Sequence, residues 1–501
     1  MKKFFLAFMM MVLILVQNFV EAQHMRLRHP DWAPDVRQAV NDFLDCYGVD
    51  SPTYCKESYV VFDFDNSTAI YDIEYQTFIH RVKTMSYGFT PEELQNALLF
   101  DLKTPDKVFD LTSKDLGKGS LRQRVQDLCD DYTYLWKKYG PFTYKGLSEK
   151  QQKIVQQDQR WQDFAAKMGA YKSFAGGYIP NGDFGLQNLI ADMTTSEVYD
   201  VVWRAMDKYS KTDTAKVHWE TVNHKLGKGK LVYEEQDGVT VTPNMKELWA
   251  ALKDNGIDVW VCSASCIDEV LAAVDYFGLH NYCKGAIAMT PKVKDEKIML
   301  GYDWDGGYGY YCLPNNKWER MSRQVKAAPA GLGKVIGINN AIAPEYKNHG
   351  PLAGFMDSTG DFNFCTEYKT LKLVICFNRA DRKVTDGGGL ISALAIYQRD
   401  GLGYDFNKAN ANGDTLYVLQ GRDVRGLRKF RPYNCSYVLG VAEPRLFASE
   451  QNWQQLLYMM RNKMTTAQVL NTFAVKTDAK NSVLGFKYGF LNEYSGYHSK
   501  K

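Results

Sequence analysis

The sequence predicts an α/β protein built on a doubly wound, Rossmann-like parallel sheet with a large, mostly helical insertion. Short apolar runs of strand length alternate with helical patterns, which is the order that a parallel sheet requires. A polar and aromatic stretch between the first two runs, residues 86–235, has mainly helical patterns. The apolar runs are Tyr59–Phe62, Ile257–Cys262, Pro351–Met356 and Leu371–Phe377.

The N-terminal elements begin with a helix over Pro34–Cys46, in which apolar residues recur at helical spacing until Gly48 ends it. The strand Tyr59–Phe62 follows, and then a helix over Asp72–Val82. In the insertion, Thr90 and Glu93 flank Pro91 as a capping box that starts a helix. Further helices are predicted over Leu121–Lys138, Ser148–Met168 and Phe184–Tyr209.

The next stretch returns to alternating helices and strands. Thr242 and Pro243 open a helix that Asn255 and Gly256 close, and the strand Ile257–Cys262 follows directly. The remaining helices are predicted over Asp268–Phe277 and Gly333–Ile342. From residue 381 onward we expect helices and loops packed on the core, in a role that the sequence does not indicate.

Composition excludes several classes of protein. The chain has 501 residues, of which 45% are hydrophobic and 24% charged, as in globular proteins. Its formal net charge of +3 gives no reason to expect a nucleic-acid partner. With a mean hydropathy of −0.38 and one long apolar run, it is not a polytopic membrane protein.

The N-terminus has the pattern of a secretory signal peptide. Lys2 and Lys3 precede the apolar run Phe4–Val16, and small residues stand at the sites that favour cleavage after Ala22. The alternative is an uncleaved membrane anchor reaching Val20. We expect cleavage, a periplasmic or secreted protein and no stable membrane span.

Ten cysteines in an exported chain are candidates for disulfide bonds. Cys46 with Cys55 is the most plausible local pair and Cys283 with Cys312 is another, but spacing alone leaves the pairing open. The eight histidines lack metal-ligand spacing, so a structural zinc site is not expected.

Polar residues follow the predicted strands where open α/β sheets bind ligands. Asp63 and Asp65 end the first strand and Asp357 ends the third, with Asp361 four residues later. Clustered carboxylates repel one another unless a hard cation lies among them, and Mg²⁺ prefers oxygen ligands. Adding the hydroxyl of Ser263 and the charge of Lys334 gives a set suited to phosphoryl transfer. Ser265 and Lys326 are alternatives to these last two.

These residues resemble, in order and in the spacing of the last two, the four motifs of the haloacid dehalogenase (HAD) superfamily. The stretch Asp63–Glu74 is most similar to the phosphorylcholine phosphatase branch, near the phosphoserine phosphatases. The resemblance covers roughly residues 55–380.

The resemblance implies a role for each residue. Asp63 would form an aspartyl-phosphate, and Asp65 would protonate the departing alcohol and then activate water. The phosphoryl group would be held by Ser263 and Lys334. Metal ligands would be Asp63, the backbone carbonyl of Asp65, Asp357 and Asp361. Dehalogenases of the superfamily lack the second aspartate, so Asp65 favours hydrolysis of phosphate esters.

The resemblance also implies a division into a HAD core, residues 23–85 and 236–380, and a cap, residues 86–235. The signal peptide, residues 1–22, precedes them, and residues 381–501 form a C-terminal extension that the resemblance does not explain. Asp72 and Glu74, near the start of the cap, would face a cationic group of the substrate. Equally, they fit a solvated first helical turn.

Two positions depart from the family pattern. Ser67 stands where Thr is usual, which keeps a hydroxyl, and Met356 replaces a Gly and would crowd the site. The expected function is an exported, Mg²⁺-dependent phosphomonoesterase for a small phosphorylated metabolite, phosphocholine or phosphoserine being the leading guesses. The alternative is a catalytically silent binding protein of the same fold.

Two further motifs have ordinary structural interpretations. The aromatic stretch Tyr302–Tyr311 could form a cage for a quaternary ammonium group, but a hairpin turning at Gly306 and Gly307 is favoured. Asp386–Gly389 lacks the spacing of a phosphate-binding glycine motif, so a flexible loop is favoured.

Overall fold

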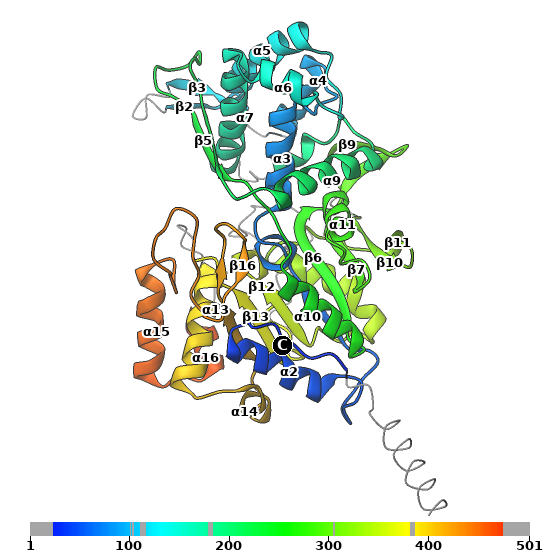
Figure 1. The fold of residues 1–501 in the computed structure, drawn as a ribbon, viewed down its shortest axis with the longest axis vertical. Coiled ribbons are helices and arrows are strands. Elements are labelled where there is room, and N and C mark those ends of the chain that lie inside the picture. The colour runs from blue at the N-terminus through cyan, green and yellow to red at the C-terminus, as the bar shows by residue number, and fades with distance from the viewer. Residues whose placement is uncertain are drawn as a thin grey trace, which may run out of the picture.

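The computed structural model describes residues 24–100, 102, 105–110, 117–178, 184–303, 306–380 and 386–473, so the expected signal peptide lies outside this part. The predicted α/β fold is confirmed. An eight-stranded sheet, in the order β11-β10-β7-β6-β1-β12-β13-β14, lies between helices (Figure 1). Its strands are β1 (Tyr59–Phe62), β6 (Asp258–Cys266), β7 (Cys283–Met289), β10 (Tyr308–Leu313), β11 (Lys317–Gln324), β12 (Ala353–Met356), β13 (Leu373–Phe377) and β14 (Leu416–Gln420).

Six neighbouring strands of the sheet, β7 to β14, are parallel, and β10 and β11 add an antiparallel edge. The predicted hairpin turning at Gly306 and Gly307 is wrong, because the segments on either side of these glycines pair with other strands. Tyr302 ends β9 (Lys297–Tyr302), which pairs with β8 (Pro291–Lys294), whereas Tyr308 starts β10, which pairs with β7 and β11. The aromatic residues on either side of the two glycines therefore belong to different sheets.

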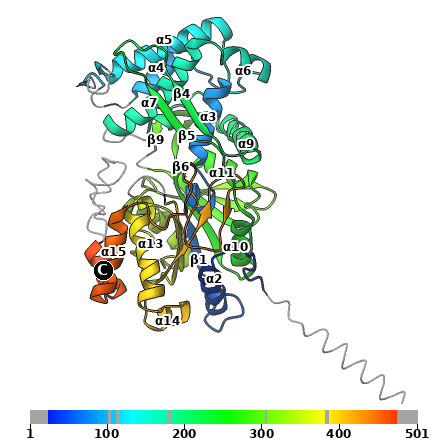
Figure 2. The same ribbon diagram turned by 60° about the vertical axis from the view of Figure 1, so that its left-hand side comes forward.

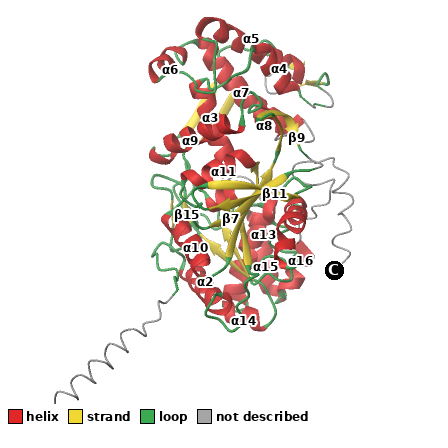
Figure 3. Ribbon diagram, turned by 90° about the vertical axis from the view of Figure 1, so that its right-hand side faces the viewer, coloured by secondary structure: helices red, strands yellow, loops and turns green. Residues whose placement is uncertain are grey.

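Both faces of the sheet are buried, as a doubly wound fold requires. Val60 and Phe62 pack in a cluster with α2, α10 and α11, whereas Tyr59 and Val61 pack in another with α12, α13, α15 and α16 (Figure 3). The bounds are α2 (Pro34–Tyr47), α10 (Pro243–Asp254), α11 (Ile267–Tyr276), α12 (Leu332–Gly337), α13 (Asp386–Ile396), α15 (Glu450–Asn462) and α16 (Thr466–Phe473).

The C-terminal part of the chain is more than helices and loops packed on the core. The buried strand β14 pairs in parallel with β13 and extends the sheet. The glycines after Asp386 start helix α13 rather than a flexible loop, and they let it approach the sheet closely. A Cβ atom on Gly388 would lie 2.5 Å from the carbonyl oxygen of Asp357. The remaining elements here are α14 (Phe406–Ala411), β15 (Arg422–Asp423) and β16 (Lys429–Phe430).

The insertion forms a separate layer above the sheet, together with α3 and the β8–β9 hairpin (Figures 1 and 2). It is mostly helical, but it also contains the antiparallel pairs β2–β3 and β4–β5, which the sequence analysis did not predict. Its elements are α3 (Ile73–Thr84), α4 (Pro91–Leu99), β2 (Val108–Asp110), β3 (Lys118–Ser120), α5 (Leu121–Tyr139), α6 (Glu149–Val155), α7 (Gln159–Tyr178), α8 (Phe184–Asn188), α9 (Thr195–Lys211), β4 (Lys216–Glu220) and β5 (Val232–Gln236).

Two helices predicted as continuous are each divided in two. The run from residue 148 to 168 breaks before Gln159, where the carboxylate of Asp158 accepts a hydrogen bond from the Arg160 backbone N–H. The run from 184 to 209 breaks before Thr195, where Thr194 and Glu197 form a capping box. In each case a local cap starts a new helix inside an apolar pattern that continues.

All ten cysteines lie in the described part of the chain, and all ten are free thiols. Neither candidate disulfide is formed. The thiols of Cys283 and Cys312 instead donate to the carbonyl oxygens of Gly285 at 3.4 Å and His280 at 3.1 Å. Among the described helices, none is both long and apolar enough to span a membrane.

Candidate active site

The predicted site residues meet at the carboxyl end of the sheet. β1 lies between β6 and β12, and the chain adds later strands first on the β6 side and then on the β12 side. In open α/β folds, ligands bind at the carboxyl ends of the strands where the order of strand addition reverses, which here is beside β1. Asp63 directly follows β1 and Asp357 directly follows β12, while Ser263 and Ser265 lie near the end of β6.

The turn Phe64–Thr68 fixes the orientation of Asp63. The hydroxyl of Ser67 donates to Asp63 Oδ2 at 2.9 Å, and that of Thr68 donates to the Asp63 backbone oxygen at 2.6 Å. Asn66 has φ of 59°, a left-handed conformation that asparagine tolerates better than most residues. The buried guanidinium of Arg422 donates to the Asn66 carbonyl oxygen. Ser67 therefore supplies the hydroxyl in this sequence, and the C-terminal part of the chain holds the turn.

Lys334 lies between two buried carboxylates. Its ammonium group donates to Asp63 Oδ1 at 2.6 Å and to Asp361 Oδ1 at 2.5 Å. All three side chains are almost completely buried, at 2%, 9% and 2% exposure respectively. Burial and the negative charge of Asp361 raise the pKa of Asp63 to about 6, against the opposing effect of Lys334. Burial likewise raises the pKa of Asp361 to about 6.

A third carboxylate, that of Asp357, completes a group suited to a cation. Oxygens of Asp63, Asp357 and Asp361 lie within 4.8 Å of one another. Arg379 donates to Asp357 Oδ2 at 3.1 Å, and burial raises the pKa of Asp357. These three carboxylates face two cations, Lys334 and Arg379, which leaves one negative charge over. Oxygen donors with surplus negative charge fit Mg²⁺.

Asp65 points toward β6 and its carboxylate is not part of this group. Its Oδ2 accepts from Ser265 Oγ at 2.7 Å and from Ser263 Oγ at 3.5 Å, and its Oδ1 accepts from the Ile73 backbone N–H at 2.7 Å. Burial and the neighbouring charge of Asp72 raise its pKa well above the usual range. A carboxyl group whose pKa is raised is suited to give and take a proton as a general acid and base.

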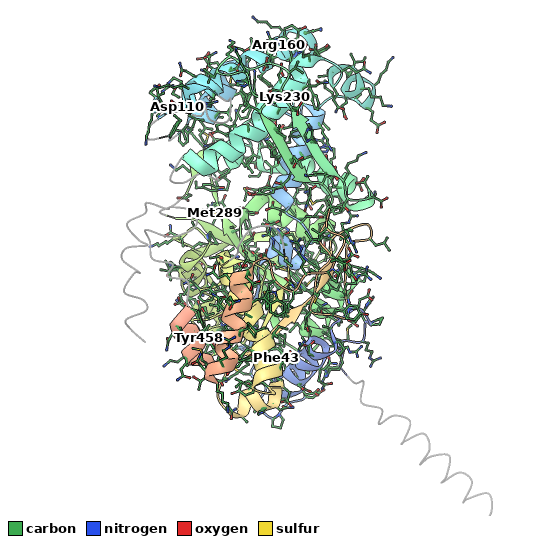
Figure 4. All side chains as sticks on the ribbon, turned by 90° about the vertical axis from the view of Figure 1, so that its left-hand side faces the viewer. Phe43, Asp110, Arg160, Lys230, Met289 and Tyr458 are labelled. Carbon is green, nitrogen blue, oxygen red and sulfur yellow. The ribbon has the colours of Figure 1, made fainter. Side chains whose placement is uncertain are left out.

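These residues line one cavity of about 170 Å³ between the sheet and the layer above it. Asp72 caps α3 by accepting from the Tyr75 N–H at 2.9 Å, and Glu74 Oε1 accepts from the Cys266 N–H at 2.8 Å. Figure 4 shows Met289 at the junction of the two layers. The other lining residues include Asp72, Glu74, Tyr75, Leu186, Met289 and Tyr302.

The structure distinguishes between residues that the sequence offered as alternatives for the site. Ser265 lines the cavity, whereas Ser263 is fully buried beside it and accepts from the Ser265 N–H at 3.1 Å. Lys334 lines the cavity, whereas Lys326 is exposed on the surface. Met356 does not crowd the site as expected, because its side chain packs in the apolar cluster on one face of the sheet.

Sequence reasoning missed two arginines. Arg379 stands two residues after the predicted strand Leu371–Phe377, so its position at a strand end was a usable signal. Arg422 follows β14, a strand that was not predicted, so nothing marked it.

Neither the protein-family models nor the curated protein sequences compared with this chain give a match. Among solved structures, it is similar to a conserved protein of unknown function from Anaerococcus prevotii DSM 20548, with a TM-score of 0.62, 23% identity, and coverage of 83% of this chain and 99% of that one. This likeness supports the fold.

Two more distant structures have TM-scores of 0.25 and 12% identity, too low to support a conclusion about activity. One is a protein of unknown function from Bordetella pertussis Tohama I, with 72% of this chain and 97% of that one covered. The other is cytosolic 5'-nucleotidase IIIB bound to cytidine, with 72% and 81% covered.

Proposed function

We propose that the protein is a Mg²⁺-dependent phosphomonoesterase of the HAD superfamily that acts through an aspartyl-phosphate. One observation carries the proposal: the carboxylate of Asp63 lies against Lys334 and within 4.8 Å of Asp357 and Asp361, at the end of the central strand. A nucleophile, a fixed cation and a carboxylate metal site thus meet at one point, which is what phosphoryl transfer requires.

In the proposed reaction, an Asp63 oxygen attacks phosphorus while the bond from phosphorus to the alcohol oxygen breaks. Asp65 gives its proton to that oxygen, so the alcohol leaves neutral. Asp65 then takes a proton from a water molecule that attacks the phosphoryl group, which releases phosphate and restores Asp63.

Other residues hold the phosphoryl group during these steps. Lys334 and a hydroxyl of the Ser263–Ser265 pair would contact its oxygens. Asp63, Asp357, Asp361 and the backbone carbonyl of Asp65 would hold Mg²⁺, which supplies charge neutralisation on the phosphoryl oxygens when bound.

The proposal extends to the rest of the chain. Residues 86–235 act as a cap that shields the reaction from water, and residues 1–22 direct export and are removed after Ala22. The silent binding protein gains no support, because Met356 packs away from the cavity. N-terminal sequencing of the mature protein from its host tests export, and a mature chain that starts at Met1 contradicts it.

Substitution tests the enzymatic part. Asp63→Asn and Asp65→Asn should each abolish phosphate release from an aryl phosphate ester, while Asp50→Asn, at a site with 66% of the side chain exposed, should keep it. EDTA should remove activity and Mg²⁺ should restore it. Full activity in Asp63→Asn, or wild-type protein that releases no phosphate with Mg²⁺ present, overturns the proposal.

A further inference from the structure

A second cavity of about 20 Å³, room for a group the size of a water molecule, shares Glu74 and Leu186 with the first. We call it the distal chamber. One face of α3 forms its floor, since Glu74, Thr77, Phe78 and Arg81 follow one another at helical spacing. The other walls come from the loop after α3, from α8 and the turn after it, and from the junction of β6 with α11. Their residues are Tyr87, Leu186, Gln187, Leu189, Ile190, Cys266 and Glu269.

Two polar side chains of the distal chamber are buried without hydrogen-bond partners. Gln187 is 3% exposed, and neither the nitrogen nor the oxygen of its amide has a partner among the described residues. The hydroxyl of Tyr87 is buried and equally unpartnered. Leaving such a group unpaired costs about 1–3 kcal/mol, and native structures contain few of them. Two such side chains in one chamber indicate an occupant, a buried water molecule or a group of a ligand, that supplies the missing hydrogen bonds.

The distal chamber contains two carboxyl groups, those of Glu74 and Glu269. Glu269 is 4% exposed, and no hydrogen bond or ion pair joins its carboxylate to another residue in the described ranges. The lining cation is Arg81, whose guanidinium is already bound by Asp192 at 2.9 and 3.0 Å and by the Ser86 carbonyl oxygen at 2.8 Å. A cationic group in the chamber would be a partner for Glu269, and its charge would favour the ionised form of that carboxyl group.

We propose that the distal chamber binds the primary ammonium group of a phosphorylated amino alcohol, with Glu269, Gln187 and Tyr87 as specificity residues. This inference rests on the proposed function, which places the phosphate at Asp63 in the adjoining cavity. A primary ammonium has three N–H donors for the Glu269 carboxylate, the Gln187 amide oxygen and the Tyr87 hydroxyl. A quaternary ammonium has none, so it would leave the last two groups unpaired.

The test separates binding from turnover. Calorimetry with Mg²⁺ compares 2-aminoethylphosphonate with ethylphosphonate and the trimethylammonio analogue, all of which resist hydrolysis. We expect the primary amine to bind at least about 30-fold more tightly than either of the others, which corresponds to about 2 kcal/mol. Glu269→Gln should reduce this preference to less than about 3-fold, while Glu92→Gln, on an exposed turn of α4, should keep it.

Each outcome has one meaning. Equal affinities for the three phosphonates, or tightest binding of the trimethylammonio compound, overturn the inference. Preferential binding of the primary amine without hydrolysis of 2-aminoethyl phosphate or an aryl phosphate supports the distal chamber and overturns the phosphatase. Hydrolysis of these esters without any preference for the amine supports the phosphatase and overturns the inference about the distal chamber. If no phosphonate binds and no ester is hydrolysed, both are wrong.

Discussion

The first cavity, whose inner end we call the phosphate end, and the distal chamber bury polar groups in opposite ways. At the phosphate end, Lys334 pairs with Asp63 and Asp361, and Arg379 pairs with Asp357. In the distal chamber, the side-chain amide of Gln187 and the hydroxyl of Tyr87 have no hydrogen-bond partner among the described residues. The phosphate end therefore depends on its own ion pairs, whereas the distal chamber is incomplete until a ligand fills it.

This contrast gives opposite expectations for stability. Removing a member of the paired cluster leaves a buried charge without compensation, which is strongly destabilising. Removing an unpartnered polar group relieves a penalty that the folded state already carries. Substitutions at the phosphate end should therefore lower both activity and stability. Substitutions of the unpartnered groups in the distal chamber should lower ligand binding but raise stability.

Lys334→Met should have the largest effect. It leaves Asp63 and Asp361 facing each other without their shared cation, so the free energy of unfolding should fall by about 3–5 kcal/mol. Phosphate release should fall by at least about 10²–10³-fold. Urea denaturation and an aryl phosphate assay measure both, and Lys326→Met is the matched surface control. An unchanged free energy of unfolding in Lys334→Met would show that the buried carboxylates do not depend on this ion pair, and would contradict the contrast.

Arg422→Met should have an intermediate effect. The substitution removes a charged donor from the buried Asn66 carbonyl oxygen, a loss of about 1.5–3 kcal/mol in unfolding free energy. Because that turn orients Asp63, kcat should fall more than KM changes. Arg422→Lys should restore part of kcat. If Arg422→Met lowers stability but leaves kcat unchanged, Arg422 has a purely structural role.

Gln187→Leu should act in the opposite direction. Leucine fills similar space without an unpaired amide, so the free energy of unfolding should rise by about 1 kcal/mol. The affinity for 2-aminoethylphosphonate should fall in the same variant. A loss of stability on urea denaturation would show that the amide is satisfied in the folded protein and would remove the contrast between the two ends.

Glu269→Gln should have the smallest effect, visible as a change in pH dependence. Burial and the charges of Asp72 and Asp65, opposed by Arg81, raise the pKa of Glu269 to about 8. Because the folded state holds this proton more tightly, the stability it contributes is fully present below the ordinary glutamate pKa and is lost as pH rises through about 8. Unfolding free energies across this range should therefore decline less steeply in Glu269→Gln, and a slope equal to that of Glu92→Gln would contradict this.

The sequence was sufficient to predict four strands of the sheet, β1, β6, β12 and β13, and the phosphate end, because these have local signals. Asp63 and Asp357 directly follow apolar runs, and the carboxyl ends of parallel strands meet at one edge. Ser265 stands two residues from Ser263 on the same extended strand, so alternation places both on one face and periodicity cannot choose between them.

The distal chamber had no comparable signal. Gln187 comes from α8, Glu269 from α11 and Tyr87 from the loop after α3, and these meet only through helix packing. Whether a buried amide has a partner depends on that packing. Arg422 was missed for a related reason: β14 enters the sheet far along the chain, so its contact with Asn66 is a long-range one.

Trapping the reaction intermediate tests the central claim most directly. Protein quenched during turnover of an aryl phosphate with Mg²⁺ is reduced with borohydride, which converts an aspartyl-phosphate into homoserine, and is then digested and sequenced by mass spectrometry. We predict homoserine at position 63 in the wild-type protein and none in Asp63→Asn. Phosphate release by the wild type without any modification at position 63, or with phosphate on Ser265, would contradict the assignment of Asp63 as the nucleophile.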